Sequence, residues 1–246
     1  MLYLSKPLYL IVAKKEIAMT RYSAGDVVGI LIFFFWFIVF IINIIIGIVL
    51  LVQINKMDPL ETGEVVTGIY TIKNWYVNPY LVEVGDGKYI IIDTGRDSPG
   101  VKKGLVELDI EREDVVAVFL THTDTDHING LKLFKNAEVY AGAESKHRKV
   151  SEKMSDGQVV DIGGVKVKCI FTPGRTYDSV CYLVDGKYLF AGDTLSLHDG
   201  EVGLFNKVYN KSDEMQAESI QKLADLSGIE YIFSAHYGFT SNPIFP

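Results

Sequence analysis

The residues from Thr121 to Gly130 read Thr-His-Thr-Asp-Thr-Asp-His-Ile-Asn-Gly, so two histidines and two aspartates fall within six positions. They directly follow the apolar run Val115–Leu120. Imidazole and carboxylate groups at this density are the ligands that zinc and iron take in proteins. A polar loop with helix-capping Asp and Thr is the alternative, but it does not require this ordered pattern. The segment therefore predicts a metal site at the end of a buried strand.

The same segment resembles the signature of the metallo-β-lactamase fold superfamily, His-x-His-x-Asp-His, with Asp124 in place of the second histidine. The resemblance extends over about residues 62–240. It includes Tyr80-Leu-Val-Glu-Val, Ile90-Ile-Ile-Asp-Thr-Gly, Thr172-Pro-Gly-Arg-Thr, Phe190-Ala-Gly-Asp-Thr-Leu and Ala235-His-Tyr-Gly, in the family's order and at its usual spacings. It implies an α+β fold, a four-layer αββα sandwich, with two adjacent metal sites.

By this resemblance the second metal site has a complete set of ligands, namely Asp126, His127, Asp193 and His236. The first site keeps His122 but has Asp124 and Arg175 where the family has histidines. A carboxylate is a competent ligand and favours harder ions such as Mn or Fe. A guanidinium stays protonated and cannot coordinate a metal.

The two departures occupy ligand positions of the same site and carry opposite charges. We therefore predict that Asp124 and Arg175 form an ion pair, bidentate in its strongest form, that fills the place of the first metal. A mononuclear enzyme follows from this hypothesis. The alternatives for Arg175 are binding of a substrate phosphate or carboxylate, and a loop arginine that points to solvent.

The implied chemistry is hydrolysis, because a bound divalent ion lowers the pKa of a water molecule toward about 7. Zinc is the expected metal, with Mn or Fe as alternatives. Asp126 and Asp193 would hold the ion and accept a proton, and Arg175 would stabilise a developing oxyanion. His122 would be a further ligand or a proton shuttle. Asp93 matches a family position that supports the ligands from behind; a turn aspartate at a strand end is the alternative.

The expected substrate is a small ester, thioester, lactone or phosphodiester. A non-catalytic binding protein is the second reading, and Arg175 is its best evidence. A membrane-associated nuclease is a third, suggested by Asp124. Residues 1–26 carry a net charge of +2 and the whole chain −7, which leaves −9 for residues 27–246. Such an acidic domain has no electrostatic footprint for nucleic acid, so no such partner is expected.

Residues 27–52 form an uncharged apolar run of 26 residues. A membrane-spanning helix needs about 20, so the run predicts a span in the lipid bilayer rather than a buried core helix or a cleaved signal peptide. The basic residues that precede it are Lys6, Lys14, Lys15 and Arg21, whereas only Lys56 follows closely. This asymmetry predicts a cytoplasmic N-terminus and an extracytoplasmic domain in the cell membrane.

The chain thus divides into a basic segment (1–26), a transmembrane helix (27–52), a linker (53–61) and a metallo-β-lactamase-like domain (62–246). Met19 is an alternative start. Cys169 and Cys181 lie in strand-like runs, where two buried thiols are favoured over a disulfide.

Hydrophobic periodicity and turn signals predict ten strands, over residues 64–72, 80–84, 89–93, 115–120, 138–141, 158–162, 165–171, 180–184, 188–191 and 230–233. They predict helices over 98–108, from 128 to 133 onward, over 143–149 and over 212–226.

Overall fold

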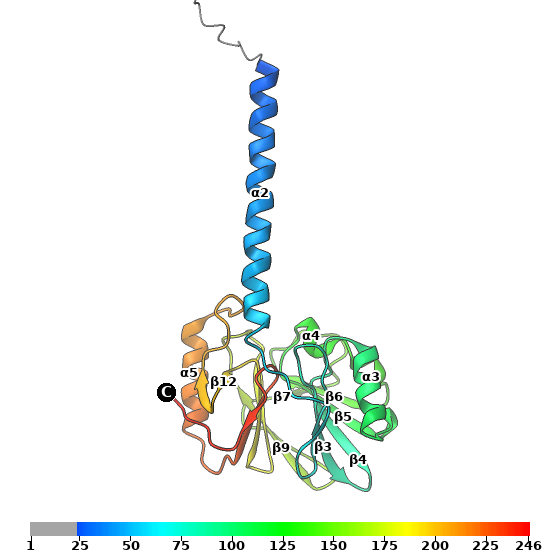
Figure 1. The fold of residues 1–246 in the computed structure, drawn as a ribbon. Coiled ribbons are helices and arrows are strands. Elements are labelled where there is room, and N and C mark those ends of the chain that lie inside the picture. Colours follow the sequence, from blue (N-terminus) through cyan, green and yellow to red (C-terminus); the bar gives the residue numbers. More distant parts are fainter. Residues whose placement is uncertain (1–23) are drawn as a thin grey trace, which may run out of the picture. The chain divides into compact units, whose positions relative to one another are not determined.

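The computed structural model describes residues 24–246 (Figure 1). The chain divides into two compact units between Val52 and Gln53, and each is described by itself. The predicted basic segment, apart from its last three residues, and the alternative start at Met19 lie outside the described residues.

The described part of the first unit is helical: helix α2 runs over Ala24–Ile54 and extends beyond both ends of the predicted run 27–52. Its residues Gly25–Val52 have a mean hydropathy of 3.1, and none of this stretch is buried. Twenty-eight helical residues measure about 42 Å, more than the roughly 30 Å hydrocarbon core of a bilayer. The helix is therefore long and apolar enough to cross a membrane, a property that signal sequences near an N-terminus share.

The second unit is built on two mixed sheets. The first has seven strands in the order β1 (Gly63–Val66), β2 (Ile69–Thr71), β3 (Tyr80–Gly85), β4 (Lys88–Ile92), β5 (Val115–Leu120), β6 (Glu138–Gly142) and β7 (Glu152–Met154). The second has six, in the order β15 (Phe239–Thr240), β14 (Tyr231–Ser234), β11 (Tyr188–Gly192), β10 (Val180–Val184), β9 (Val165–Phe171) and β8 (Val159–Ile162). A small ribbon joins β12 (Ser196–His198) to β13 (Glu201–Gly203).

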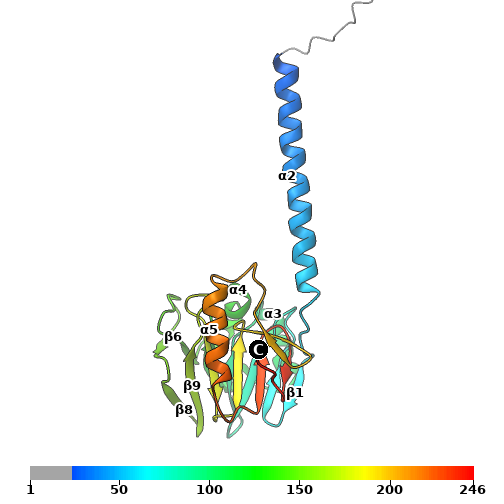
Figure 2. The same ribbon diagram turned by 90° about the vertical axis from the view of Figure 1, so that its left-hand side faces the viewer.

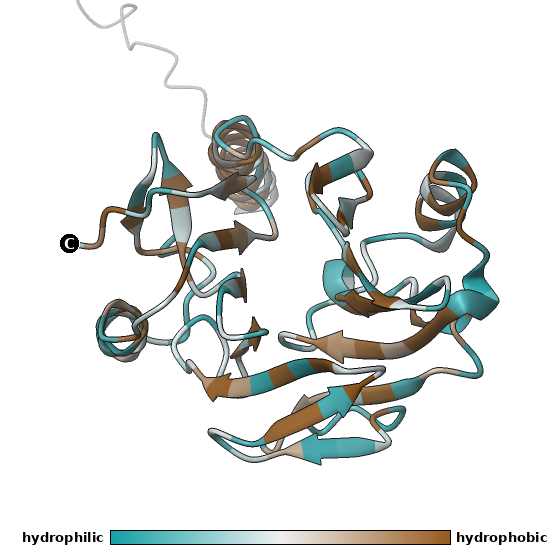
Figure 3. Cartoon of the chain, turned by 90° about the horizontal axis from the view of Figure 1, so that it is seen from below, coloured by the Kyte–Doolittle hydropathy of each residue, from teal (hydrophilic) through white to brown (hydrophobic). Residues whose placement is uncertain are grey.

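Helices cover the outer faces of both sheets. Val101 and Leu105 of helix α3 (Ser98–Glu107) pack on the first sheet, and Ile220 and Leu223 of helix α5 (Asp213–Ala224) pack on the second. A third apolar cluster, which contains Phe119, fills the space between the sheets. Figures 1 and 2 show this arrangement of layers. Figure 3 shows hydrophobic residues along the strands, and both hydrophobic and hydrophilic residues on the flanking helices. The predicted αββα sandwich is confirmed.

Local sequence explains where the two helices begin. Asp97 accepts a hydrogen bond from the backbone N–H of Gly100, and Pro99 occupies the first turn of α3. Ser212 accepts one from the backbone N–H of Met215 at the start of α5. These caps satisfy N–H groups that have no partner inside the helix.

Some predicted elements are wrong. The strand over 64–72 is a hairpin, because Gly68 adopts a left-handed φ of 75° between β1 and β2. The helix over 143–149 is absent; Ser145 instead closes a turn with the carbonyl of Gly142. That stretch has no apolar stripe to pack against the fold, so a short helix gains no support from tertiary contacts. The helix expected from 128 begins earlier, as α4 (Thr125–Ile128), followed by a 3-10 turn over Leu131–Leu133.

The predicted linker is shorter than residues 53–61, because its second half packs on the domain. The backbone N–H of Asp58 donates to the carbonyl of His236 at 2.9 Å. Leu60 and Asn78 exchange two hydrogen bonds, at 2.8 and 2.9 Å.

The two cysteines are free and buried, as favoured, and the disulfide alternative is wrong. Cys169 is paired with Tyr182 across β9 and β10, so Cys181 is paired with Ile170. Neighbouring positions on a strand point to opposite faces of a sheet. The thiols therefore lie in different apolar clusters.

Candidate metal centre

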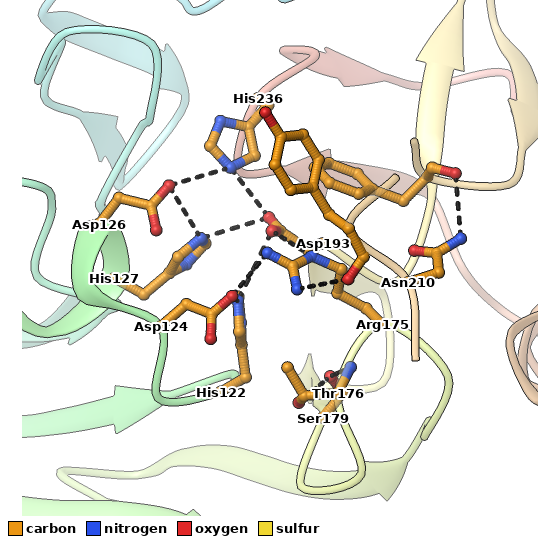
Figure 4. A network of polar contacts seen from close by, with 12 residues as sticks. His122, Asp124, Asp126, His127, Arg175, Thr176, Ser179, Asp193, Asn210 and His236 are labelled. Atoms are coloured by element: carbon orange, nitrogen blue, oxygen red, sulfur yellow. Dashed lines mark hydrogen bonds and ion pairs between the residues drawn. The ribbon is translucent and has the colours of Figure 1, made fainter. Parts of the chain in front are cut away.

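The signature residues meet at one edge of the two sheets, as Figure 4 shows. His122 follows β5, and Asp126 and His127 lie on α4. Asp193 follows β11 and His236 follows β14. Strands β4, β5 and β6 are parallel, as are β11 and β14. The carboxyl ends of parallel strands meet at the same edge, which is why residues so far apart in sequence converge here.

The four predicted ligands of the second metal site surround one small space. Asp193 Oδ1 lies 3.0 Å from His236 Nε2 and 3.3 Å from His127 Nε2. Asp126 Oδ2 lies 3.7 Å from His236 Nε2 and 3.9 Å from His127 Nε2. Ligand atoms of Asp126, His127 and His236 lie within 4.8 Å of one another. Although burial opposes it, the surrounding histidines, His236 first, hold the pKa of Asp193 well below its ordinary value. The carboxylate is therefore ionised.

Three polar atoms in this space, His122 Nε2, His127 Nε2 and Asp193 Oδ1, are buried without a hydrogen-bond partner among the described residues. Buried polar atoms without partners are rare and costly, and an ion is one of the few explanations. Two imidazoles and two carboxylates are a suitable donor set for a divalent metal. The residues present thus fit the metal that the fold implies.

Asp93 supports His127 from behind, in the role that the resemblance implies. Asp93 Oδ2 lies 2.7 Å from His127 Nδ1, so this nitrogen donates and Nε2 is left to face the site. Asp93 also accepts two hydrogen bonds from Thr121, at 2.8 and 2.7 Å. Although burial opposes it, Asp193 and Asp93 raise the pKa of His127 well above its ordinary value. A metal would displace that proton.

Arg175 lies where the first metal is expected, and its side chain is 9% exposed. Its Nη2 donates to Asp124 Oδ2 at 2.6 Å, its Nε to Asp193 Oδ2 at 3.2 Å, and its Nη1 to the carbonyl of Tyr209 at 3.0 Å. The rings of Phe205 and Tyr209 lie 5.4 and 5.6 Å from its guanidinium carbon. The predicted ion pair is present, through one nitrogen rather than two, and the solvent-pointing alternative is wrong.

His122 is buried beside this pair. Its Nε2 lies 3.5 Å from Asp193 Oδ2 and 3.7 Å from Asp124 Oδ2. Burial, followed by the charge on His127, lowers the pKa of His122 well below its ordinary value. The ring is therefore neutral. With His127 and Asp193 it forms a second group whose ligand atoms lie within 4.8 Å of one another.

The sequence did not indicate that Tyr76, in the hairpin between β2 and β3, contacts the candidate ligand His236. His236 Nδ1 donates to the backbone carbonyl of Tyr76 at 2.6 Å, and the two rings stack with centroids 5.7 Å apart. This bond leaves His236 Nε2 to face the site, as Asp93 does for His127. A backbone carbonyl leaves no signal in residue types, so no pattern in the sequence could have indicated it.

A cavity of about 350 Å³ opens onto these residues. Its polar lining includes Asp124, Asp126, Arg175, Asp193 and His236. Its apolar lining, which the sequence did not indicate, includes Met57, Tyr76, Phe205 and Tyr209. The volume is in the range typical of small-molecule sites.

Comparison with known proteins finds similarity to the same superfamily. Residues 72–160 match the model of the metallo-beta-lactamase superfamily. Over 155 residues the chain is 32% identical to a hydroxyacylglutathione hydrolase from Salmonella dublin and 30% identical to one from Salmonella typhi. Each match covers 61% of this chain and 58% of the relative, so the chain spans less than two thirds of the length of these relatives.

Solved structures share the fold at low sequence identity. A metallo-β-lactamase from Pontibacter korlensis superposes with a TM-score of 0.61 at 17% identity, covering 75% of this chain and 94% of that one. A metallo-β-lactamase with a HARLDQ motif from Cronobacter sakazakii gives a TM-score of 0.58 at 20% identity, with coverages of 74% and 80%.

Proposed function

We propose, from the premise that the chain is a member of the metallo-β-lactamase fold superfamily, that it is a metal-dependent hydrolase anchored in a membrane. The observation that carries the proposal is the set of buried, unpartnered ligand atoms on His122, His127 and Asp193, with Asp126 and His236 beside them. Zinc is the expected metal, with Mn or Fe as alternatives. The relatives named hydroxyacylglutathione hydrolase favour a thioester among the ester-like substrates.

The enzyme is proposed to hold one metal, at Asp126, His127, Asp193 and His236. Asp193 Oδ2, on the side of the first site, is already in contact with the guanidinium of Arg175. Asp124, at a ligand position of the same site, is in contact with Arg175 as well. A fixed cation therefore stands in place of the first metal, and a second divalent ion would have to displace it.

The residues of the chain take separate parts in the reaction. A metal held by Asp126, His127, Asp193 and His236 would supply Lewis acidity, which would allow water to react near neutral pH. The side chain of Asp126 is 19% exposed, against 2% or less for those of His127, Asp193 and His236, so it is the one placed to accept a proton from the cavity. Arg175 lies beside the reacting centre, where its charge would stabilise a developing oxyanion.

Metal content of the full-length chain, purified in detergent and then loaded with Zn or Mn, tests this proposal. We expect about one tightly bound metal per chain. His236→Ala should lose it, whereas His198→Ala, the same change at an exposed histidine outside the metal centre, should keep it. Two metals in the unaltered chain would contradict the mononuclear site.

Hydrolysis of a thioester by the loaded protein then separates an enzyme from a non-catalytic binding protein. We expect turnover that disappears in His236→Ala and persists in His198→Ala. A chain that binds no metal under any loading would instead favour the non-catalytic reading, for which the replacement by Arg175 is the supporting feature.

A further inference from the structure

The charges around the cavity discriminate between the substrate classes left open above. Three carboxylates, those of Asp124, Asp126 and Asp193, line the cavity, and Asp93 lies directly behind His127. The guanidinium of Arg175 and one divalent metal contribute +3 against these four negative charges. The reaction centre thus carries a net charge of about −1 when one metal is bound.

A phosphodiester would bring a further negative charge to this centre and gain another in the transition state. An uncharged ester or thioester brings no charge to the centre and gains one negative charge in the transition state. Repulsion between like charges is strong where water is scarce. The charge balance therefore favours an uncharged reacting group.

The contacts of Arg175 limit how many N–H groups it can offer to a substrate anion. Each of its three guanidinium nitrogens already donates to a protein acceptor, on Asp124, Asp193 and Tyr209. These contacts use three of its five N–H groups, so a substrate phosphate could reach only the second N–H of Nη1 and of Nη2. The guanidinium is thus held as a fixed charge, and two of its three partners are carboxylates.

The rest of the lining offers apolar surface. Phe205 is 2% exposed, and its ring is tilted by 47° relative to that of His236, with centroids 5.6 Å apart. Tyr209, Tyr76 and Met57 complete this part of the wall. An apolar group bonded to the reacting carbonyl would be removed from water against these side chains.

We propose, resting on the hydrolase function above, that the substrate is a carboxylic ester or thioester with an uncharged reacting carbonyl, whose apolar group lies against Tyr76, Phe205 and Tyr209. Phosphodiesters are disfavoured at this site. Hydrolysis then adds water across the acyl bond: the carbonyl carbon gains the hydroxyl, the bond to the leaving oxygen or sulfur breaks, and that atom takes the proton.

A pair of stable ligands with equal alkyl groups tests the charge argument by binding rather than turnover. Dipropyl ketone stands for the uncharged carbonyl and dipropyl phosphate for the phosphodiester. We expect calorimetry on the metal-loaded, full-length chain to show the ketone binding at least about 10-fold more tightly. A dipropyl phosphate that binds equally well or better, or a ketone that does not bind, would overturn the proposal.

Asp124→Asn removes one negative charge from the cavity and should improve the relative affinity for dipropyl phosphate about 10-fold. Asp86→Asn, the same change in an exposed turn between β3 and β4, should leave the ratio unchanged. Tyr209→Ala should weaken ketone binding several-fold. Tyr177→Ala, at a tyrosine that is 66% exposed and outside the cavity lining, should not.

Turnover separates failure of this inference from failure of the proposed function. A chain that hydrolyses bis(p-nitrophenyl) phosphate faster than p-nitrophenyl butyrate is a hydrolase, but it contradicts the inference. A chain that hydrolyses neither is not the proposed enzyme, and the affinities of the two ligands still decide which class the cavity accepts.

Discussion

At the scale of single residues, Arg175 places a fixed cation where the resemblance implies a neutral ligand of the first metal. Arg175 contacts Asp124 and Asp193 at once, and both are carboxylates that would otherwise face the first metal. Breaking a buried pair by removing one partner leaves the other charge uncompensated. The site should therefore respond to Arg175 variants through the number of metals it binds.

Arg175→His restores a neutral nitrogen ligand beside His122 and Asp124. We expect the metal content to rise from about one to about two per chain, because a second divalent ion now compensates Asp124 and Asp193. Elemental analysis after loading measures this. Arg175→Lys is the matched control: it keeps the charge and should stay at one metal. An Arg175→His chain that still binds one metal would show that Arg175 is not what excludes the second.

Asp93→Asn should lower the metal affinity about 10- to 100-fold, since a carboxylate behind a metal-binding histidine orients the ring and raises its basicity. The fold should survive, because asparagine tolerates the left-handed φ of 57° that Asp93 adopts. Chelator competition measures the affinity. Asp86→Asn, also at a left-handed φ (51°) but exposed, should have no effect. Equal affinities in both variants would refute the supporting role.

At the scale of elements, the hairpin between β2 and β3 is held to the start of α3 through Asn74. Asn74 is 1% exposed and bonds the backbone of Asp97 at both its N–H and its carbonyl. Gly95 and Gly100 leave room for its amide: a Cβ there would lie 2.7 and 2.1 Å from Asn74 atoms. The hairpin in turn presents the Tyr76 carbonyl to His236.

Gly100→Ala tests this arrangement. Alanine is the better helix former, so propensity alone would stabilise α3 by up to about 1 kcal/mol. We expect destabilisation of about 1–3 kcal/mol instead, because the new methyl group collides with Asn74. The displaced hairpin should also weaken metal binding. Thermal unfolding and chelator competition measure the two effects.

Gly63→Ala is the control for this change, since a Cβ there meets nothing within 4 Å. A Gly100→Ala chain as stable as the unaltered one, with the same metal affinity, would mean that the hairpin adjusts freely and does not position His236.

At the scale of the whole molecule, the chain joins an acidic domain to an apolar helix whose residues 27–52 carry no charge. If α2 is a membrane span, the full-length chain should remain in the membrane pellet after carbonate extraction at high pH. A chain that begins at Gln53 should be released. A signal sequence would give the opposite result for the full-length gene product, a shortened and soluble mature chain, which its mass would reveal.

Most of the secondary structure and the candidate ligands could be predicted from local sequence alone. The apolar run over 27–52 predicts a long helix, and the apolar strands and capped helices predict the layers, because burial and capping act over a few neighbouring residues. The signature also indicated the ligands, since ligand chemistry depends on residue type. The prediction of a helix over 143–149 was wrong because local composition allowed a helix there but no tertiary contact supported it.

Only the tertiary structure decided how the metal centre is arranged. The Arg175 contact with Asp124 joins residues 51 apart in sequence, and the Tyr76 carbonyl meets His236 across 160 residues. The opposite directions of Cys169 and Cys181 follow from the register of β9 and β10. Contacts between residues so far apart in sequence depend on how whole strands and loops pack, which no local pattern encodes. The sequence indicated the candidate ligands, and the packing decided which charges they face.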